Sequence, residues 1–134
     1  MAHDILVVDD EDDIRLLIAG VLKDEGYGTR LAASDVEADA AMNMRRPSLV
    51  ILDVWLEGSQ RDGLDILRRL REEHPDLPVI MISGHGTVEG AVQAIKIGAY
   101  DFIEKPFKAD RLLLVVARAI EGALGKASTG TEQI

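Results

Sequence analysis

The sequence contains no cysteine, and this absence excludes disulfide bonds, thiolate metal sites and cysteine nucleophiles. No apolar run is long enough to cross a lipid bilayer. The N-terminus MAHDILVV lacks the basic start and the apolar middle of a signal peptide. We therefore expect a soluble, cytoplasmic protein that makes no contact with a membrane.

Positive charge is also scarce, because 24 acidic residues face 15 basic ones and the net charge is -9. A surface for the nucleic-acid backbone needs clustered positive charge, so direct nucleic-acid binding by this chain is not expected. A metal ion or a cationic partner fits the charge better. The 134 residues are 47% hydrophobic, which is enough for one core and too little for two ordinary domains.

Five apolar runs of strand length alternate with helical segments. The runs are residues 4–9, 27–32, 48–53, 78–83 and 101–105. The first, third and fourth are apolar almost throughout, as strands buried on both faces must be. This alternation predicts an α/β fold, in which a (βα)5 chain forms a doubly wound, five-stranded parallel sheet with helices on both faces.

The helical segments carry apolar stripes at helical spacing. The predicted stripes are Ile14, Leu17, Ile18, Val21 and Leu22 in the first helix, Val88, Ala91, Val92 and Ile95 in the fourth, and Leu112, Val115, Val116, Ala119 and Ile120 in the fifth. The second helix begins at a capping box, Ser34 to Glu37, and Gly26 and Gly98 are predicted helix stops. Apolar period is lost near residue 122, so we expect a domain over 1–122, followed by a fraying helix end and flexible linker over 123–134.

Charged and polar side chains stand where the predicted strands end: Asp9, Asp10, Asp53, Ser83 and Lys105. The carboxyl ends of parallel strands share one edge of a sheet, where ligands bind. Crowded carboxylates without histidine or cysteine nearby favour a hard cation such as Mg²⁺. A carboxylate beside Mg²⁺ can attack a phosphoryl group, with Lys105 neutralising charge and Ser83 donating a hydrogen bond.

Each of these residues also has a simpler interpretation. Asp53 alone could be a solvated carboxylate at a strand end or a helix cap. The run DDEDD, residues 9–13, could be an exposed loop with favourable charge at a helix start, and Glu11, Asp12 and Asp13 fit a first turn better than a ligand set. Ser83 could satisfy a turn amide. Lys105 could be an ordinary surface residue.

Two other functions compete. A nucleotide-binding module would use a glycine-rich turn, and GHGTVEG at 84–90 offers one, but that turn belongs after the first strand, which here ends in carboxylates. A Mg²⁺-dependent phosphatase working through an aspartyl phosphate would place a second acid two residues after its nucleophile. That position is Trp55, so turnover of free phosphate esters is not expected.

Four ordered motifs carry a family resemblance: ILVVDDEDDIR, LVILDVWL, VIMISGHG and GAYDFIEKPF. From residue 4 to about 122 the chain resembles the receiver domains of response regulators in two-component signalling. ISGHGT…AVQAIKIGAYDFIEKPF is most similar to receivers that precede a sigma-54-type AAA+ ATPase and a helix-turn-helix domain, and WLEGSQRDG resembles the NtrX type within this NtrC/NtrX-like group. The resemblance implies the flavodoxin-like strand order 2-1-3-4-5.

The resemblance also implies residue roles. Asp53 would accept a phosphoryl group from a sensor histidine kinase, and Lys105 would contact that group. Mg²⁺ would be bound by Asp10, Asp53 and the backbone carbonyl of Trp55, with Asp9 acting through water. Ser83 and Phe102 would form the switch, and the Lys105–Pro106 bond would be cis. The chain would be a signalling switch that catalyses only its own phosphotransfer and dephosphorylation, and so would not be an enzyme acting on a separate substrate.

Further expectations concern partners and loops. Receivers commonly form homodimers through the fourth helix, fifth strand and fifth helix, and the implied output is transcription regulation by domains absent from this chain. Trp55 and His85 would shape the lifetime of the phosphorylated state. The loop after Asp53 reaches Asp62 and Gly63 two residues later than in typical receivers, with Leu56 and Glu57 in place of Met and Pro. We therefore expect this loop to be mobile without metal.

Overall fold

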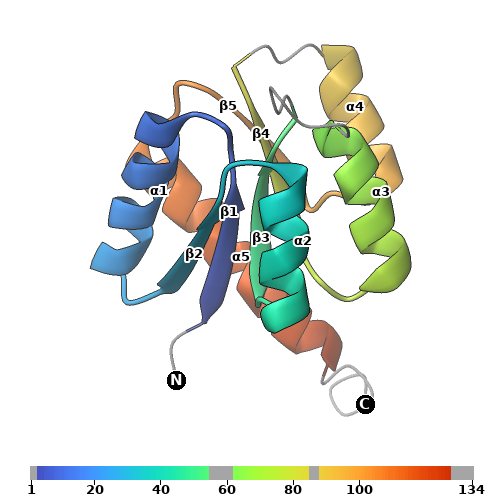
Figure 1. Cartoon of the computed structure of the whole chain (residues 1–134), viewed down its shortest axis with the longest axis horizontal. Helices are drawn as coiled ribbons and strands as arrows, with labels where there is room; N and C mark the ends of the chain where they lie inside the picture. Colours follow the sequence, from blue (N-terminus) through green and yellow to red (C-terminus); the bar gives the residue numbers. More distant parts are fainter. Residues whose placement is uncertain (1–2, 55–61, 85–87, 128–134) are drawn as a thin grey trace.

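The computed structural model describes residues 3–54, 62–84 and 88–127, and it contains one five-stranded parallel sheet. The strands are β1 (Asp4–Val8), β2 (Gly28–Ala32), β3 (Leu49–Asp53), β4 (Val79–Ser83) and β5 (Asp101–Glu104). Their order is β2-β1-β3-β4-β5, and every neighbouring pair is parallel (Figure 1). The predicted fold class and strand order are confirmed. Each strand is one residue shorter than its apolar run, because Asp9 and Lys105, among others, lie just outside the ladder.

In the described part of the chain, five helices cover both faces of this sheet: α1 (Asp12–Asp24), α2 (Asp35–Met44), α3 (Gly63–Glu73), α4 (Val88–Ile97) and α5 (Ala109–Ala127). In Figure 1, α2 and α3 lie in front of the sheet and α5 lies behind it. Strand side chains alternate between the two layers. Leu6 and Leu52 join the core under α2, α3 and α4, whereas Ile5 and Ile51 join the core under α1 and α5. The structure therefore has two hydrophobic cores that share one sheet.

The predicted apolar stripes are only partly buried. The stripe of α5 is buried at every position, as predicted. In α1, Ile18 and Leu22 are fully buried, but Leu17 is 51% exposed. In α4, Val92 and Ile95 are 47% and 48% exposed while Ala94 is buried in the core, so much of this stripe lies at the surface. Helical spacing identifies residues that share a face, but it does not say whether the sheet or solvent lies against that face.

The helix ends agree with the local sequence signals. Ser34 Oγ accepts a hydrogen bond from the Glu37 amide at 3.2 Å, and Glu37 Oε1 accepts one from the Ala33 amide at 3.1 Å. Gly26 and Gly98 have φ values of +90° and +127°, a region that side chains disfavour, so glycine ends α1 and α4 as predicted. Among the described residues, no helix is long and apolar enough to cross a membrane.

Candidate functional site

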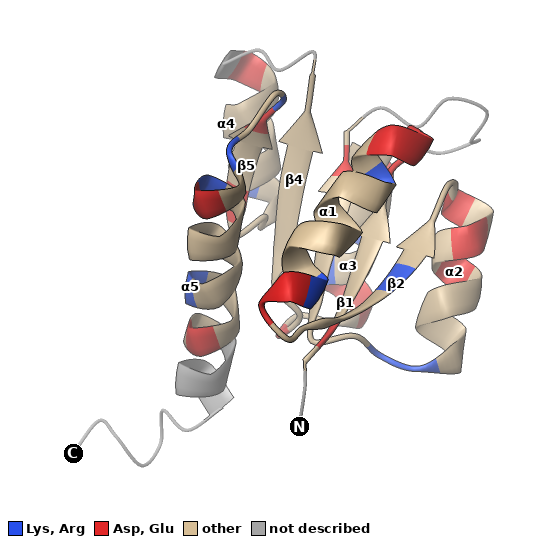
Figure 2. Cartoon of the chain, turned by 90° about the vertical axis from the view of Figure 1, so that its left-hand side faces the viewer, with Lys and Arg blue, Asp and Glu red and all other residues tan. Residues whose placement is uncertain are grey.

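The candidate site lies at the carboxyl ends of the strands, where Asp53 is the last residue of β3 and Asp9 directly follows β1. Both carboxylates are buried, with Asp9 0% and Asp53 3% exposed. Their two strands are neighbours in the middle of the sheet, so the fold delivers both acids to one point. Figure 2 shows that the acidic start of α1 lies at this same end of the molecule.

Lys105 brings positive charge to these carboxylates from the end of β5. Its Nζ lies 2.8 Å from Asp9 Oδ2, 3.1 Å from Asp53 Oδ2 and 3.1 Å from Glu11 Oε1. Burial of this side chain opposes its charge and lowers its pKa, but the three carboxylates more than offset burial and raise the pKa above the ordinary lysine value. Lys105 is therefore a fixed cation beside Asp53.

The carboxylates also fit a divalent cation. One oxygen from each of Asp9, Asp10, Glu11 and Asp53 can be chosen so that all four lie within 4.8 Å of one another. Asp9 Oδ1 accepts a hydrogen bond from the Glu11 amide at 2.8 Å, and the buried Asp9 Oδ2 lies 2.8 Å from the Lys105 ammonium. A set of oxygen donors crowded in this way suits Mg²⁺ in preference to softer metals.

Ser83 lies at the end of β4, and Phe102 lies on the neighbouring strand β5. Ser83 ends β4 and is 1% exposed, and its carbonyl oxygen accepts a hydrogen bond from the Lys105 amide at 2.9 Å. Phe102 pairs with Met81 in the sheet and is half buried on the side of α4, where it lines an open groove with Val92 and Ile95. The Lys105–Pro106 peptide bond that follows β5 is cis.

The start of α3 lies against the backbone at the end of β3. The Asp62 side chain caps this helix by accepting from the Asp65 amide at 2.9 Å, and the Gly63 amide donates to the Val54 carbonyl at 2.8 Å. Helix α3 is thereby tied to the backbone directly after Asp53. The residues between, 55–61, lie outside the described part of the chain, as do the predictions for Trp55 and for the mobility of this loop.

A family model described as the response regulator receiver domain matches residues 5–117. The chain belongs to the response regulator receiver domain family. The charged cluster of this receiver lies at the edge of the sheet where Asp9, Asp10, Asp53 and Lys105 were expected to converge.

This receiver is similar to several response regulators and receiver domains. A nitrogen assimilation regulatory protein, NtrX of Azorhizobium caulinodans, is 60% identical over 121 residues, which are 90% of this chain and 27% of that protein. The crystal structure of the receiver domain of NtrX from Brucella abortus is 64% identical with a TM-score of 0.85, covering 88% of this chain and 98% of that chain. The solution structure of the beryllofluoride-activated NtrC4 receiver domain dimer is 40% identical with a TM-score of 0.83, covering 90% and 98%. The chain spans about a quarter of the length of the curated relatives it matches.

Sequence reasoning missed one residue of this receiver's charged cluster. Glu11 was assigned to an ordinary first helical turn, but α1 begins at Asp12, and Glu11 is its N-cap with the carboxylate directed at Lys105. Its position directly after Asp9 and Asp10 places Glu11 near the site but does not reveal the contact with Lys105. His85, a second residue singled out in the sequence, lies outside the described residues.

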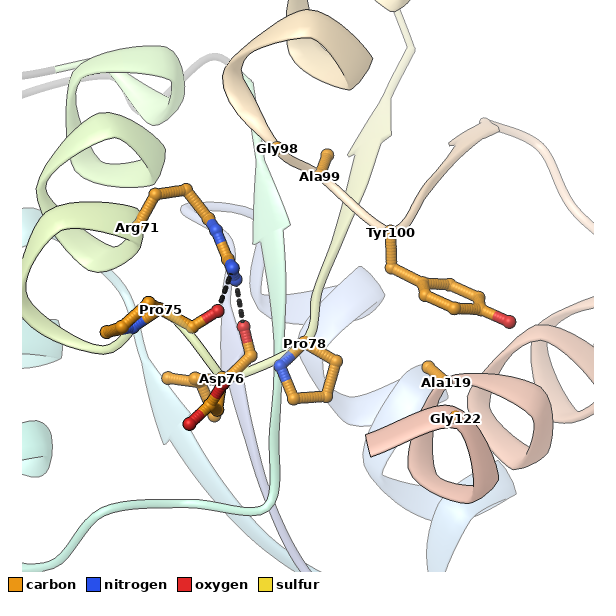
Figure 3. Close-up of a pocket in the computed structure, with 10 residues that line it drawn as sticks. Arg71, Pro75, Asp76, Pro78, Gly98, Ala99, Tyr100, Ala119 and Gly122 are labelled. Carbon is orange, nitrogen blue, oxygen red and sulfur yellow. Dashed lines mark hydrogen bonds between the residues drawn. The ribbon is translucent and has the colours of Figure 1, made fainter. Parts of the chain in front are cut away.

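A separate pocket lies at the opposite end of the receiver, among the α3–β4 and α4–β5 connections and α5 (Figure 3). Its main cationic group, the guanidinium of Arg71, donates hydrogen bonds to the carbonyl oxygens of Pro75 and Leu77. Arg71 thus fastens the connection before β4. This pocket holds none of the residues expected at the phosphorylation site.

Proposed function

We propose that this receiver accepts a phosphoryl group on Asp53 from a sensor histidine kinase in a Mg²⁺-dependent reaction. The observation that carries the proposal is the buried Asp53 carboxylate, 3.1 Å from the Lys105 ammonium, inside a cluster of acidic oxygens. A carboxylate held beside fixed positive charge can attack phosphorus, whereas a solvated carboxylate at a strand end has no such partner.

The reaction forms an oxygen–phosphorus bond at Asp53 and breaks the nitrogen–phosphorus bond of the kinase phosphohistidine, whose imidazole leaves with the electron pair. Asp10, Asp53 and the backbone carbonyl of Trp55 would hold Mg²⁺, with Asp9 acting through water. Bound Mg²⁺ would neutralise the acidic cluster and the phosphoryl oxygens. Lys105 neutralises charge on the transferring group, and the Ser83 hydroxyl donates a hydrogen bond to one of its oxygens.

The phosphorylated state then acts as a signal. Ser83 and Phe102 lie on the neighbouring strands β4 and β5. Movement of Ser83 toward the phosphoryl group shifts an equilibrium between an inactive and an active conformation, and Phe102 then packs inward and changes the face formed by α4, β5 and α5. The chain catalyses only its own phosphotransfer and dephosphorylation, in the cytoplasm. The output is sigma-54-type transcription regulation by domains beyond this chain, and this domain itself does not bind nucleic acid.

A homodimer through α4, β5 and α5 is the second proposal. Val92 and Ile95 are half exposed, and together with Ala91 and Phe102 they line an open apolar groove on this face. A contiguous apolar surface of this kind is typical of an interface. The beryllofluoride-activated NtrC4 receiver domain, which is 40% identical, is a dimer, and this supports dimerisation of the present receiver.

Intact-mass measurement after incubation with acetyl phosphate and Mg²⁺ tests the phosphorylation proposal. The wild-type chain should gain one phosphoryl group, and neither Asp53→Asn nor wild type in excess chelator should gain it. Equal labelling of wild type and Asp53→Asn would contradict the assignment. A calorimetric titration with ATP or NAD tests the alternative that the chain is a nucleotide-binding module. This receiver should show no heat of binding with either nucleotide.

A further inference from the structure

Three carboxylates surround the Lys105 ammonium among the described residues, and Glu11 differs from the other two. Asp9 and Asp53 are buried and belong to the proposed metal and acceptor set. The Glu11 side chain is 60% exposed and yet lies 3.1 Å from Nζ. An exposed glutamate could extend into water, where it would keep its rotational freedom. Its contact with Lys105 therefore needs a physical reason.

The position of Glu11 in α1 would allow its side chain a different hydrogen bond. Glu11 is the N-cap residue, and an N-cap side chain ordinarily accepts a hydrogen bond from a free amide of the first turn. Glu11 makes no such side-chain bond. Its own amide instead donates to Asp9 Oδ1 at 2.8 Å, which fixes the direction of the residue, and its carboxylate turns to Lys105, 94 positions away. Helix α1 thus gives the end of β5 a charge partner and gains no cap from this side chain.

We propose that Glu11 is a positioning residue that restrains Lys105 in the unphosphorylated site. This inference rests on the proposed function of Asp53 as the acceptor. An ammonium has three N–H groups, and here three carboxylates surround it. To contact a phosphoryl oxygen on Asp53, Lys105 must give up a resting partner. Glu11 is the partner outside the proposed acceptor and metal-ligand set, and it stabilises the resting position of Nζ at the expense of the phosphorylated one.

The restraint has a kinetic consequence. Loss of the Glu11 charge frees one N–H of Lys105 for the transferring phosphoryl group, so Glu11→Gln should be phosphorylated faster than wild type. The acceleration should be roughly two- to fivefold, the size expected for one half-exposed ion pair. The substitution keeps the length of the side chain and removes no capping hydrogen bond. Helix α1 should therefore lose only one favourable charge at its start, and the control variant loses such a charge as well.

The experiment measures the rate constant of phosphorylation by acetyl phosphate, followed by intact mass after acid quenching, at a Mg²⁺ concentration that saturates each variant. Asp13→Asn is the matched control, because Asp13 is an exposed acid in the first turn of the same helix and its substitution removes the same charge. This control should react at the wild-type rate. Glu11→Gln should then be measured in a Lys105→Gln background, where its acceleration should disappear.

Each outcome decides the proposal. Acceleration in the native background that vanishes without Lys105 supports a restraint acting through Lys105. An unchanged or slower rate in Glu11→Gln overturns it, and so does an equal acceleration in the Lys105→Gln background or in Asp13→Asn, since Glu11 would then only repel the anionic donor. These failures differ from failure of the acceptor assignment, in which wild type would not be labelled or Asp53→Asn would be.

Discussion

Gly63, the first residue of α3, lies directly against the backbone of Asp53. A Cβ atom on Gly63 would be 2.1 Å from the Asp53 carbonyl oxygen and 2.7 Å from Val54 Cα. Both neighbours are main-chain atoms of the strand end, so they cannot rotate away as a flexible side chain could. The start of α3 and the proposed phospho-acceptor are thus packed at a distance that only glycine allows.

Gly63→Ala should displace the end of β3 and with it Asp53. We expect a loss of about 1 to 3 kcal/mol in the free energy of unfolding, the usual cost of forcing extra volume into a packed site, and slower phosphorylation by acetyl phosphate. Urea unfolding and intact mass measure the two effects. Gly20→Ala is the control: no atom lies within 4 Å of the added Cβ, and alanine in this exposed helix interior should gain about 0.5 to 1 kcal/mol. Equal effects of both substitutions would contradict the packing argument.

The acidic cluster should bind Mg²⁺, and without the metal the repulsion among its carboxylates should destabilise the folded protein. Four carboxylates crowd within 4.8 Å, so replacing one of them by Asp10→Asn should raise the thermal midpoint in chelator by removing like-charge repulsion. The same substitution should remove most of the midpoint increase that Mg²⁺ gives wild type, because the metal stabilises only the folded state that binds it. Asp13→Asn should keep the Mg²⁺ response. Retention of that response by Asp10→Asn would argue against this cluster as the metal site.

The raised pKa of Lys105 predicts a pH dependence of stability in the metal-free protein. Burial alone would lower this pKa, but Asp9, Asp53 and Glu11 raise it above the ordinary value of 10.5. The folded state therefore holds the proton more tightly than the unfolded state. The contribution of Lys105 is fully present below pH 10.5 and is lost as the pH rises through the higher folded-state pKa.

Urea unfolding of wild type and Lys105→Met measures this contribution as a difference in unfolding free energy. The difference should be constant between about pH 8 and pH 9.5 and should shrink only at higher pH. A difference that already shrinks near pH 8 would mean that burial outweighs the carboxylates.

The fold was predictable because β1, β3 and β4 are apolar almost throughout, and such runs must be covered on both faces. The strand ends were predicted one residue too long, since an apolar run does not reveal where ladder pairing stops. The burial of the α4 stripe could not be predicted for a similar reason. Periodicity groups Val92 and Ile95, but whether the sheet covers them depends on how α4 packs on β5 in three dimensions.

The site was predictable to the extent that strand ends meet at one edge. Asp9, Asp53 and Lys105 each follow or end a strand. Parallel topology places the Lys105 Nζ atom 2.8 Å from Asp9 Oδ2 and 3.1 Å from Asp53 Oδ2. Glu11 was not predictable as a partner of Lys105, because it lies in a helix cap and its partner is 94 residues away. Only the direction of the cap backbone, fixed by the bond to Asp9, turns Glu11 toward the site.

The half-exposed apolar face of α4 should govern self-association. Ile95→Asp places a charge in the groove beside Phe102, so it should weaken dimerisation of the beryllofluoride-treated protein in sedimentation experiments. Its folding should be little affected, because the side chain is 48% exposed in the monomer. Leu16→Asp is the matched control, since Leu16 is 65% exposed on α1, and it should leave the dimer intact. Both variants should be labelled by acetyl phosphate at the wild-type rate. Loss of association in both, or in neither, would mean that copies of this receiver meet through some other surface.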